Sequence, residues 1–202
     1  MEYLLRGILI GILFGLPVGA IGALTVQRTW SLGAKAGLLT GLGSSVADCF
    51  YACVGAFGLT LISDFLLRYQ GIITALGGIL ILVMGLKSVI HPQGELPPDE
   101  ETPGGAKLFL TSFAIGITNP AAILTFLFAF SYFGISEVNR WGDGIFLMAG
   151  VFLGTCFWWG TLAGLTQFVK RKAAIFRLRT MNRIFGGILC AFGILVFLRL
   201  FL

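Results

Sequence analysis

Three residues stand out because their chemistry does not suit the apolar stretches in which they lie. Asp48 is the one acidic residue well inside such a stretch, and Pro17 and Pro120 interrupt two others. A charged carboxylate in the middle of a bilayer costs at least about 2.5 kcal/mol, so it needs a proton, a cation or hydrogen bonds. Proline frees backbone carbonyl groups of the preceding turn, which in lipid must find another partner or line a polar cavity. These residues therefore predict a polar site inside a membrane.

Small and polar neighbours complete the predicted site. Ser44 precedes Asp48 by one helical turn, and Thr118 and Asn119 come directly before the second proline. Hydroxyl groups can donate to a carboxylate, and freed carbonyl groups can accept from an ammonium group. The predicted substrate- and proton-binding residues are Asp48, Asn119, Thr118, Pro17, Pro120, Gly19 and Ser44. The structural alternative is that the prolines only kink their helices for packing and that Asp48 only makes hydrogen bonds.

The composition places the chain in a membrane. Of its 202 residues, 57% are hydrophobic and 11% are charged, whereas a soluble domain carries roughly 25% charged residues. A run of roughly 18 apolar residues can cross a hydrocarbon core about 30 Å thick, and six such runs occur, at 7–27, 36–63, 69–90, 108–133, 144–169 and 183–202. These runs lack the alternating pattern of a membrane barrel. The predicted fold class is an all-α membrane protein with six transmembrane helices.

The sequence repeats on either side of a linker. Residues 91–107 are rich in proline, glycine and acid and separate a first three-helix repeat, 1–90, from a second, 108–202. The matches are Gly37 with Gly144, Gly43 with Gly150 and Cys49-Phe50 with Cys156-Phe157 at an offset of 107, and Gly77-Gly78 with Gly186-Gly187 at an offset of 109. Because each repeat has an odd number of spans, the two have inverted topology, as in many secondary transporters. The first span, as the partner of the fourth, is therefore interpreted as a helix and not as a cleaved signal peptide.

The basic residues set the predicted orientation. Four of the 14 lie on the side shared by both termini, namely Arg6, Arg68, Arg140 and Arg199. Ten lie on the opposite side, namely Arg28, Lys35, Lys87, Lys107, Lys170, Arg171, Lys172, Arg177, Arg179 and Arg183. Positive charge marks the cytoplasmic side, so both termini are predicted to face outward and the linker to face the cytoplasm. The net charge of +5 is thus a topology signal and predicts no nucleic-acid partner.

The remaining side chains predict no catalytic or metal centre. The four cysteines fall inside predicted spans, where they indicate packing and neither a disulfide framework nor a loop zinc site. Small residues at every fourth position of the first two spans indicate close helix packing. His91, the one histidine, lies in the linker, and no second carboxylate is available as a base. We therefore expect neither enzyme activity nor a cofactor.

Three segments carry a family resemblance. They are Pro17-Val-Gly-Ala-Ile-Gly-Ala-Leu-Thr25 with the following Arg28, the stretch from Gly37 to Asp48, and Ile117-Thr-Asn-Pro-Ala-Ala-Ile-Leu-Thr-Phe126. Together they resemble the LysE/RhtB type of bacterial amino-acid exporters, over nearly the whole chain. The resemblance implies six helices in the bacterial inner membrane and proton-coupled export of amino acids or related small metabolites. Many members carry Pro-Gly-Pro in the first helix and a lysine after the Asn-Pro, where this chain has Val18 and Ala121. The resemblance therefore does not identify the substrate.

Other functions stay open on the sequence alone. A transmembrane thiol electron conduit would need cysteines beside the helix-breaking prolines, where this chain has Leu16, Val18, Asn119 and Ala121. A metal-ion exporter would need more buried ligands than a single acid. A non-transporting membrane scaffold would be favoured if both prolines were lipid-facing kinks. The expected partners are the lipid bilayer and a small-molecule substrate, and assembly into a homo-oligomer stays open.

Overall fold

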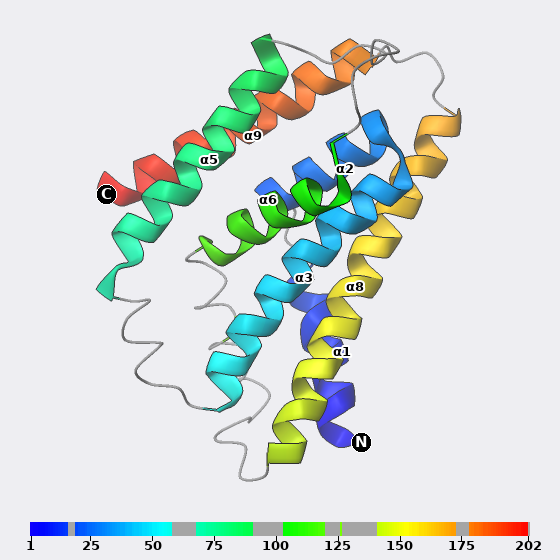
Figure 1. The fold of residues 1–202 in the computed structure, drawn as a ribbon, viewed down its shortest axis with the longest axis vertical. Coiled ribbons are helices and arrows are strands. Elements are labelled where there is room, and N and C mark those ends of the chain that lie inside the picture. The colour runs from blue at the N-terminus through cyan, green and yellow to red at the C-terminus, as the bar shows by residue number, and fades with distance from the viewer. Residues whose placement is uncertain are drawn as a thin grey trace.

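The computed structural model describes residues 1–15, 19–57, 68–90, 103–119, 126, 141–172 and 178–201. These residues form seven helices, α1 (Glu2–Gly15), α2 (Ala20–Leu32), α3 (Ala34–Ala56), α5 (Gln70–Ile90), α6 (Gly105–Ile117), α8 (Trp141–Lys172) and α9 (Leu178–Phe201) (Figure 1). Within this part of the chain, α3, α5 and α8 are long and apolar enough to cross a membrane, and α6 and α9 hold shorter apolar stretches. The described residues are thus consistent with the predicted all-α membrane protein.

The first predicted span consists of two helices. α1 and α2 flank residues 16–18, and Pro17 with its neighbours lies outside the described residues. Gly19 is the N-cap of α2. α2 runs on to Leu32, five residues beyond the predicted end of the span at residue 27, and Gly33, with φ +95°, leads directly into α3. Glycine adopts this left-handed conformation without a steric penalty, so a single residue joins two neighbouring helices.

The other predicted spans agree with the helices where the structure describes them. α3, α5, α8 and α9 occupy most of the second, third, fifth and sixth spans. α6 begins the fourth span and ends with Thr118 as its C-cap. Pro120 and nearly all of residues 120–140 lie outside the described part of the chain. The predicted interruption of the fourth span therefore stays a prediction.

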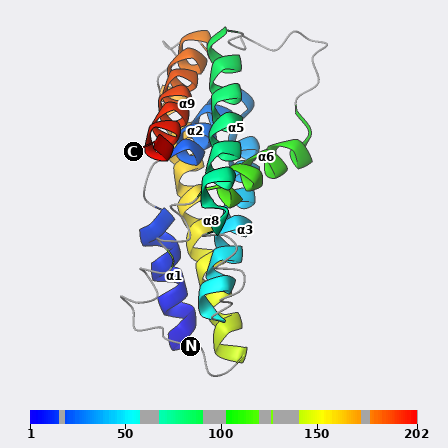
Figure 2. The ribbon, with the colours of Figure 1, turned by 90° about the vertical axis from the view of Figure 1, so that its left-hand side faces the viewer.

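The helices form parallel and antiparallel pairs (Figures 1 and 2). α1 runs parallel to α8, and α6 runs parallel to α3, whereas α3 with α8 and α5 with α9 are antiparallel pairs. α2 packs against α3, α8 and α9. α5 ends, and α9 begins, at the end of the molecule opposite the N-terminus (Figure 1). Outward-facing side chains such as Leu76 and Phe157 are large, apolar and exposed, as lipid contact requires.

Glycine residues allow the closest helix contact. A Cβ at Gly7 in α1 would overlap the carbonyl oxygen of Leu147 in α8, and a Cβ at Gly150 would overlap the carbonyl oxygen of Leu4. The backbones of α1 and α8 therefore touch. Small residues spaced by four permit such contact between membrane helices, so the packing predicted for the first span is confirmed here.

Candidate functional site

Three helices meet at Gly116, near the end of α6. A Cβ at this position would lie 2.8 Å from the Cβ of Ala47 in α3 and 3.6 Å from the Cδ1 of Ile21 in α2. The middle of α3, the start of α2 and the end of α6 therefore lie side by side. Asp48 directly follows Ala47, so it stands at the level where α2 begins and α6 ends.

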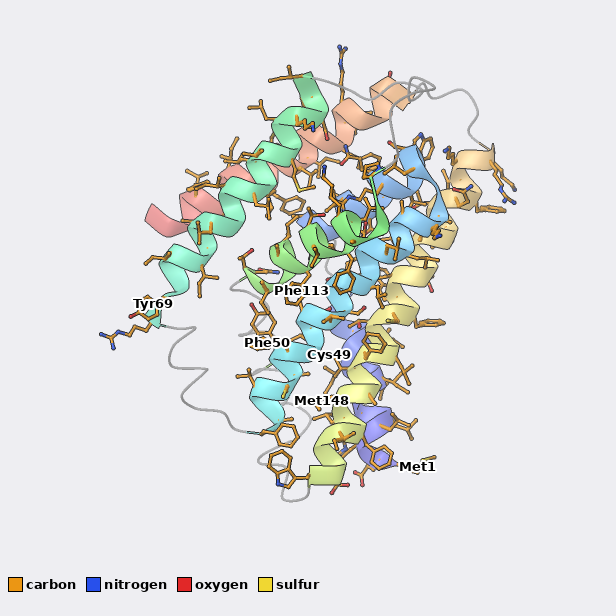
Figure 3. All side chains as sticks on the ribbon, viewed as in Figure 1. Met1, Cys49, Phe50, Tyr69, Phe113 and Met148 are labelled. Carbon is orange, nitrogen blue, oxygen red and sulfur yellow. The ribbon has the colours of Figure 1, made fainter. Side chains whose placement is uncertain are left out.

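Asp48 is half-buried at this level. Within the described residues its carboxylate has neither a hydrogen-bond partner nor an ion-pair partner. Ser44, which is 2% exposed, lies one turn earlier on the same face of α3. The next residue, Cys49, points elsewhere, since its Sγ lies 3.8 Å from the carbonyl oxygen of Met148 in α8 (Figure 3). A membrane carboxylate without a protein partner needs a proton, a solute or water; the binding role expected of Asp48 stays a prediction.

Tyr51 joins α3 to the end of α6. Its hydroxyl donates a 2.6 Å hydrogen bond to the carbonyl oxygen of Ile117. This carbonyl is the last of α6, and no N–H of that helix reaches it, so the Tyr51 hydroxyl supplies its hydrogen bond. The sequence analysis missed Tyr51, although its place three residues after Asp48 puts both residues on one helix face.

Thr118 and Asn119 follow at the end of α6. The Thr118 hydroxyl donates to the carbonyl oxygen of Ala114 at 2.7 Å, and its side chain lies against Gly77 of α5. The Asn119 backbone N–H donates to the carbonyl oxygen of Gly116 at 3.1 Å, and Asn119 is exposed. The described contacts therefore place Thr118 toward α5 and do not join it to Asp48.

Gly19 lies where α2 begins. It makes no side-chain cap, and a Cβ there would meet no atom within 4 Å. The first amide groups of α2 thus have no side-chain acceptor from the cap, and the partial positive charge of a helix start is located here. Of the predicted residues, Asp48, Ser44 and Gly19 lie at one level of the molecule together with the end of α6. Pro17 and Pro120 lie outside the described residues, so their expected pairing stays a prediction.

Buried polar atoms without hydrogen-bond partners occur on three neighbouring helices. Within the part of the chain that the structure describes, they include Thr25 Oγ1 in α2, Ser45 Oγ in α3 and Trp159 Nε1 in α8. The three helices pack against one another, and Trp159 contacts the position of Gly41, one turn before Ser45. Each unpaired buried group costs about 1–3 kcal/mol. A hydrogen-bond partner for any of these atoms would therefore be stabilising.

Arg28 corrects the sequence interpretation. The sequence predicts Arg28 in the loop after the first span, but α2 continues to Leu32, so Arg28 is helical and only 9% exposed. Its Nη1 donates to Thr40 Oγ1 at 3.1 Å and to the carbonyl oxygen of Leu108 at 2.8 Å. Its Nη2 donates to Thr111 Oγ1 at 2.6 Å. Arg28 thereby links α2 to α3 and α6.

Metal ligands do not gather in the described residues. No group of three or more histidine, cysteine, aspartate or glutamate residues there could hold a metal ion. The four cysteines are free, and each is partly buried within a helix. Among the described residues, Asp48 itself contributes a single carboxylate that can accept hydrogen bonds and bind a cation.

Comparison with known proteins assigns the family. The profile of the LysE type translocators matches residues 12–199. "Uncharacterized membrane protein YahN" of Escherichia coli (strain K12) is 27% identical over 180 residues, which cover 87% of this chain and 80% of that protein. "Putative amino acid efflux protein YcgF" of Bacillus subtilis (strain 168) is 24% identical over 208 residues, covering 96% and 94%. No solved structure gives a significant match. The chain is thus an integral membrane protein and belongs to the LysE type translocator family.

Proposed function

We propose that the protein is a secondary transporter of the bacterial inner membrane that exports amino acids or related small metabolites by alternating access. In this proposal the proton gradient drives export, and both termini face outward. The translocator family and the amino acid efflux in the name of the Bacillus subtilis relative support a transporter. The observation that carries the architecture is a set of close helix contacts. Each contact recurs between the corresponding helices when every residue is replaced by its counterpart in the other half.

The contact between α1 and α8 recurs between α6 and α3. A Cβ at Gly150 in α8 would lie 2.9 Å from the backbone N of Ile8 in α1, and a Cβ at Gly43 in α3 would lie 3.0 Å from the backbone N of Phe113 in α6. Ile8 and Phe113 are 105 residues apart, and Gly43 and Gly150 are 107 apart. Moving α1 to α6 by 105 residues and α8 to α3 by 107 residues therefore converts the first contact into the second.

The same offsets relate a second pair of contacts, one turn further along. A Cβ at Gly11 in α1 would lie 3.0 Å from the Cα of Gly154 in α8. The counterpart of Gly11 is Gly116 in α6, 105 residues later, and the counterpart of Gly154 is Ala47 in α3, 107 residues earlier. A Cβ at Gly116 would lie 2.8 Å from the Cβ of Ala47. Two unrelated halves have no reason to reproduce both contacts in register.

The third helix pair follows the same exchange. A Cβ at Gly85 in α5 would lie 2.8 Å from the backbone N of Cys190 in α9, and a Cβ at Gly193 would lie 3.3 Å from the backbone N of Leu82. Gly85 and Gly193 are thus equivalent, as are Leu82 and Cys190, and both pairs are 108 residues apart. This offset is one residue less than that of the glycine pairs matched in the sequence. Because the corresponding helices α3 and α8, and α5 and α9, are antiparallel, the exchange supports an inverted repeat.

In this architecture Asp48 binds either a proton or the ammonium group of the solute. It stands level with the first amide groups of α2, which lack helical acceptors. The last carbonyl groups of α6 lie at the same level; they accept from Tyr51, Thr118 and Asn119 and keep a second lone pair. Carbonyl groups can accept from the same ammonium, and the start of α2 favours a carboxylate. Because proton and ammonium compete for a single carboxylate, proton entry is coupled to solute release.

Efflux from preloaded vesicles under an imposed pH gradient tests this role. Asp48→Asn keeps the size and much of the hydrogen bonding of the side chain but cannot carry the charge. We expect this variant to insert and fold normally and to lose at least about tenfold in pH-driven efflux, on the scale of one lost charged contact. Asp143→Asn, in the first turn of α8, is the matched control and should export normally. Export by Asp48→Asn at the wild-type rate and with wild-type pH dependence would eliminate the proposed role.

A further inference from the structure

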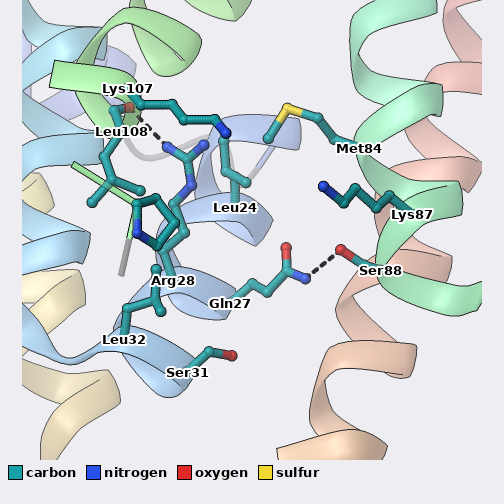
Figure 4. A pocket seen from close by; sticks show the side chains of 11 residues that line it. Leu24, Gln27, Arg28, Ser31, Leu32, Met84, Lys87, Ser88, Lys107 and Leu108 are labelled. Carbon is teal, nitrogen blue, oxygen red and sulfur yellow. Dashed lines mark hydrogen bonds between the residues drawn. The ribbon is translucent and has the colours of Figure 1, made fainter. Parts of the chain in front are cut away.

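A small cavity of about 170 Å³ lies among α2, α5 and α6 (Figure 4). It is close to the end of α5 and the start of α6, the side of the protein predicted to face the cytoplasm. At about 30 Å³ per water molecule, its volume corresponds to roughly six waters. The cavity therefore has room for a small solute or for one end of a larger one.

The charged residues that line this cavity are basic in the part of the chain that the structure describes. Arg28 from α2, Lys87 from α5 and Lys107 from α6 contribute to the lining, and no carboxylate of the described residues does. Figure 4 shows the Lys107 ammonium group beside the Arg28 guanidinium group, with Lys87 extending toward them from the opposite wall. Like charges around one cavity repel each other. A bound anion would remove this repulsion.

Arg28 retains donors for such an anion. Three of its five N–H groups donate hydrogen bonds to the neutral oxygens of Thr40, Leu108 and Thr111. The Nε–H and one Nη2–H, on neighbouring nitrogen atoms of a rigid plane, have no acceptor among the described residues. Guanidinium groups use such neighbouring donors to bind both oxygens of a carboxylate.

Membrane orientation does not explain this arrangement. Lysines at helix ends are sufficient to mark the cytoplasmic side, and Lys87 and Lys107 are exposed. Arg28, in contrast, is only 9% exposed, and a buried charge is unfavourable unless it is paired or well hydrogen-bonded. Its neutral partners satisfy part of the guanidinium group but leave its charge uncompensated within the described residues.

We infer that this cavity binds the carboxylate group of a small solute at the cytoplasmic entrance of the protein. The inference rests on the proposed function and deepens it, because it requires the exported solutes to carry a carboxylate. Lys87 and Lys107 attract the anion at the mouth of the cavity. Arg28 then fixes its orientation.

Thermal unfolding of the full-length protein in neutral detergent tests the binding, with succinate and glutamate as probes at constant ionic strength. Each probe should stabilise the wild type, and Lys87→Gln and Lys107→Gln should each weaken the apparent affinity by about tenfold, as expected for a lost charged contact. Lys35→Gln is the matched control, because Lys35 is exposed at the start of α3 and does not line the cavity. The absence of stabilisation, or equal weakening in the control, would overturn the inference.

A second arm uses inorganic phosphate and phosphatidylglycerol as probes in the same experiment. If either stabilises the wild type more strongly than succinate and does so through Lys87 and Lys107, the cavity recognises phosphate groups, and the carboxylate inference is wrong. Stronger stabilisation by succinate and glutamate supports it.

Efflux measurements distinguish a failure of this inference from a failure of the proposed function. If the wild type exports amino acids but shows no carboxylate binding in the cavity, the inference alone is wrong. If carboxylates bind through the two lysines but nothing is exported, the proposed function is wrong and the binding site stands. Export with a raised KM in Lys87→Gln and Lys107→Gln, and with an unchanged KM in Lys35→Gln, supports both.

Discussion

Glycine substitutions at the helix crossings test whether the two halves repeat the same contact. In Gly43→Ala the new Cβ would overlap the carbonyl oxygen of Phe109 in α6, and in Gly150→Ala it would overlap the carbonyl oxygen of Leu4 in α1. Both obstacles are backbone atoms, so no change of rotamer can relieve the overlap. The paired helices must separate, and each crossing loses contact along its length.

The structure sets the size of the expected effect. Overpacking of this kind costs about 1–3 kcal/mol, whereas alanine in place of glycine favours a helix by about 0.5–1 kcal/mol. We therefore expect Gly43→Ala and Gly150→Ala each to lower the free energy of unfolding by about 1–2 kcal/mol. Gly164 and Gly187 are the matched controls, because a Cβ at either would meet no atom within 4 Å. Alanine at these two positions should leave stability unchanged or slightly raised.

Reversible unfolding in mixed micelles of dodecyl maltoside and sodium dodecyl sulfate, followed by circular dichroism, measures these differences. The informative comparison is between the two crossings. If Gly150→Ala is destabilising and Gly43→Ala behaves like the controls, the crossings are not equivalent, and the exchange of contacts between the halves is refuted. If both behave like the controls, the close contact itself is wrong.

Two further predictions concern the end of α6 and the orientation. Tyr51→Phe leaves the Ile117 carbonyl without its 2.6 Å hydrogen bond and should lower the free energy of unfolding by about 1–2 kcal/mol. Tyr3→Phe is the control and should not change this free energy. Equal stability of the two variants would contradict the role of Tyr51. Single cysteines introduced into 91–107 or 170–183 of a cysteine-free variant should resist impermeant thiol reagents in intact cells, whereas a cysteine at Glu2 should react. Labelling of 91–107 from outside would reverse the proposed orientation.

Local chemistry was enough to predict where the first span is interrupted. Gly15, Pro17 and Gly19 predict a break, and Gly19, with an extended backbone, is the N-cap of α2. The end of α2 could not be predicted in the same way. Arg28, the first charge after the apolar run, predicts the end of the span, because a charge inside the bilayer is unfavourable. Hydrogen bonds that Arg28 donates to Thr40, Leu108 and Thr111 offset that penalty, and these acceptors lie on other helices.

The repeat register shows a second limit of sequence reasoning. Matching identical residues aligned the third and sixth spans with an offset of 109, whereas the contacts of Gly85 and Gly193 favour 108. Identity compares residue types, and glycine pairs are common in membrane helices. Contact depends on the face of the helix, which turns by about 100° for each residue. Only the packing partner therefore distinguishes two registers that differ by one residue.

The basic cavity and Asp48 lie at different levels along α3. Arg28 donates to Thr40 on α3, and Asp48 lies eight residues further along this helix. At 1.5 Å per residue, this spacing is about 12 Å, which exceeds the distance between the carboxylate and the α-ammonium group of an amino acid. The spacing along α3 therefore favours separate contacts of Arg28 and Asp48 with the α-carboxylate and the α-ammonium group of one amino acid. On the proposed function, the solute first presents its carboxylate to the cavity and then moves along α3 until its ammonium group reaches Asp48, so the two sites are occupied in sequence.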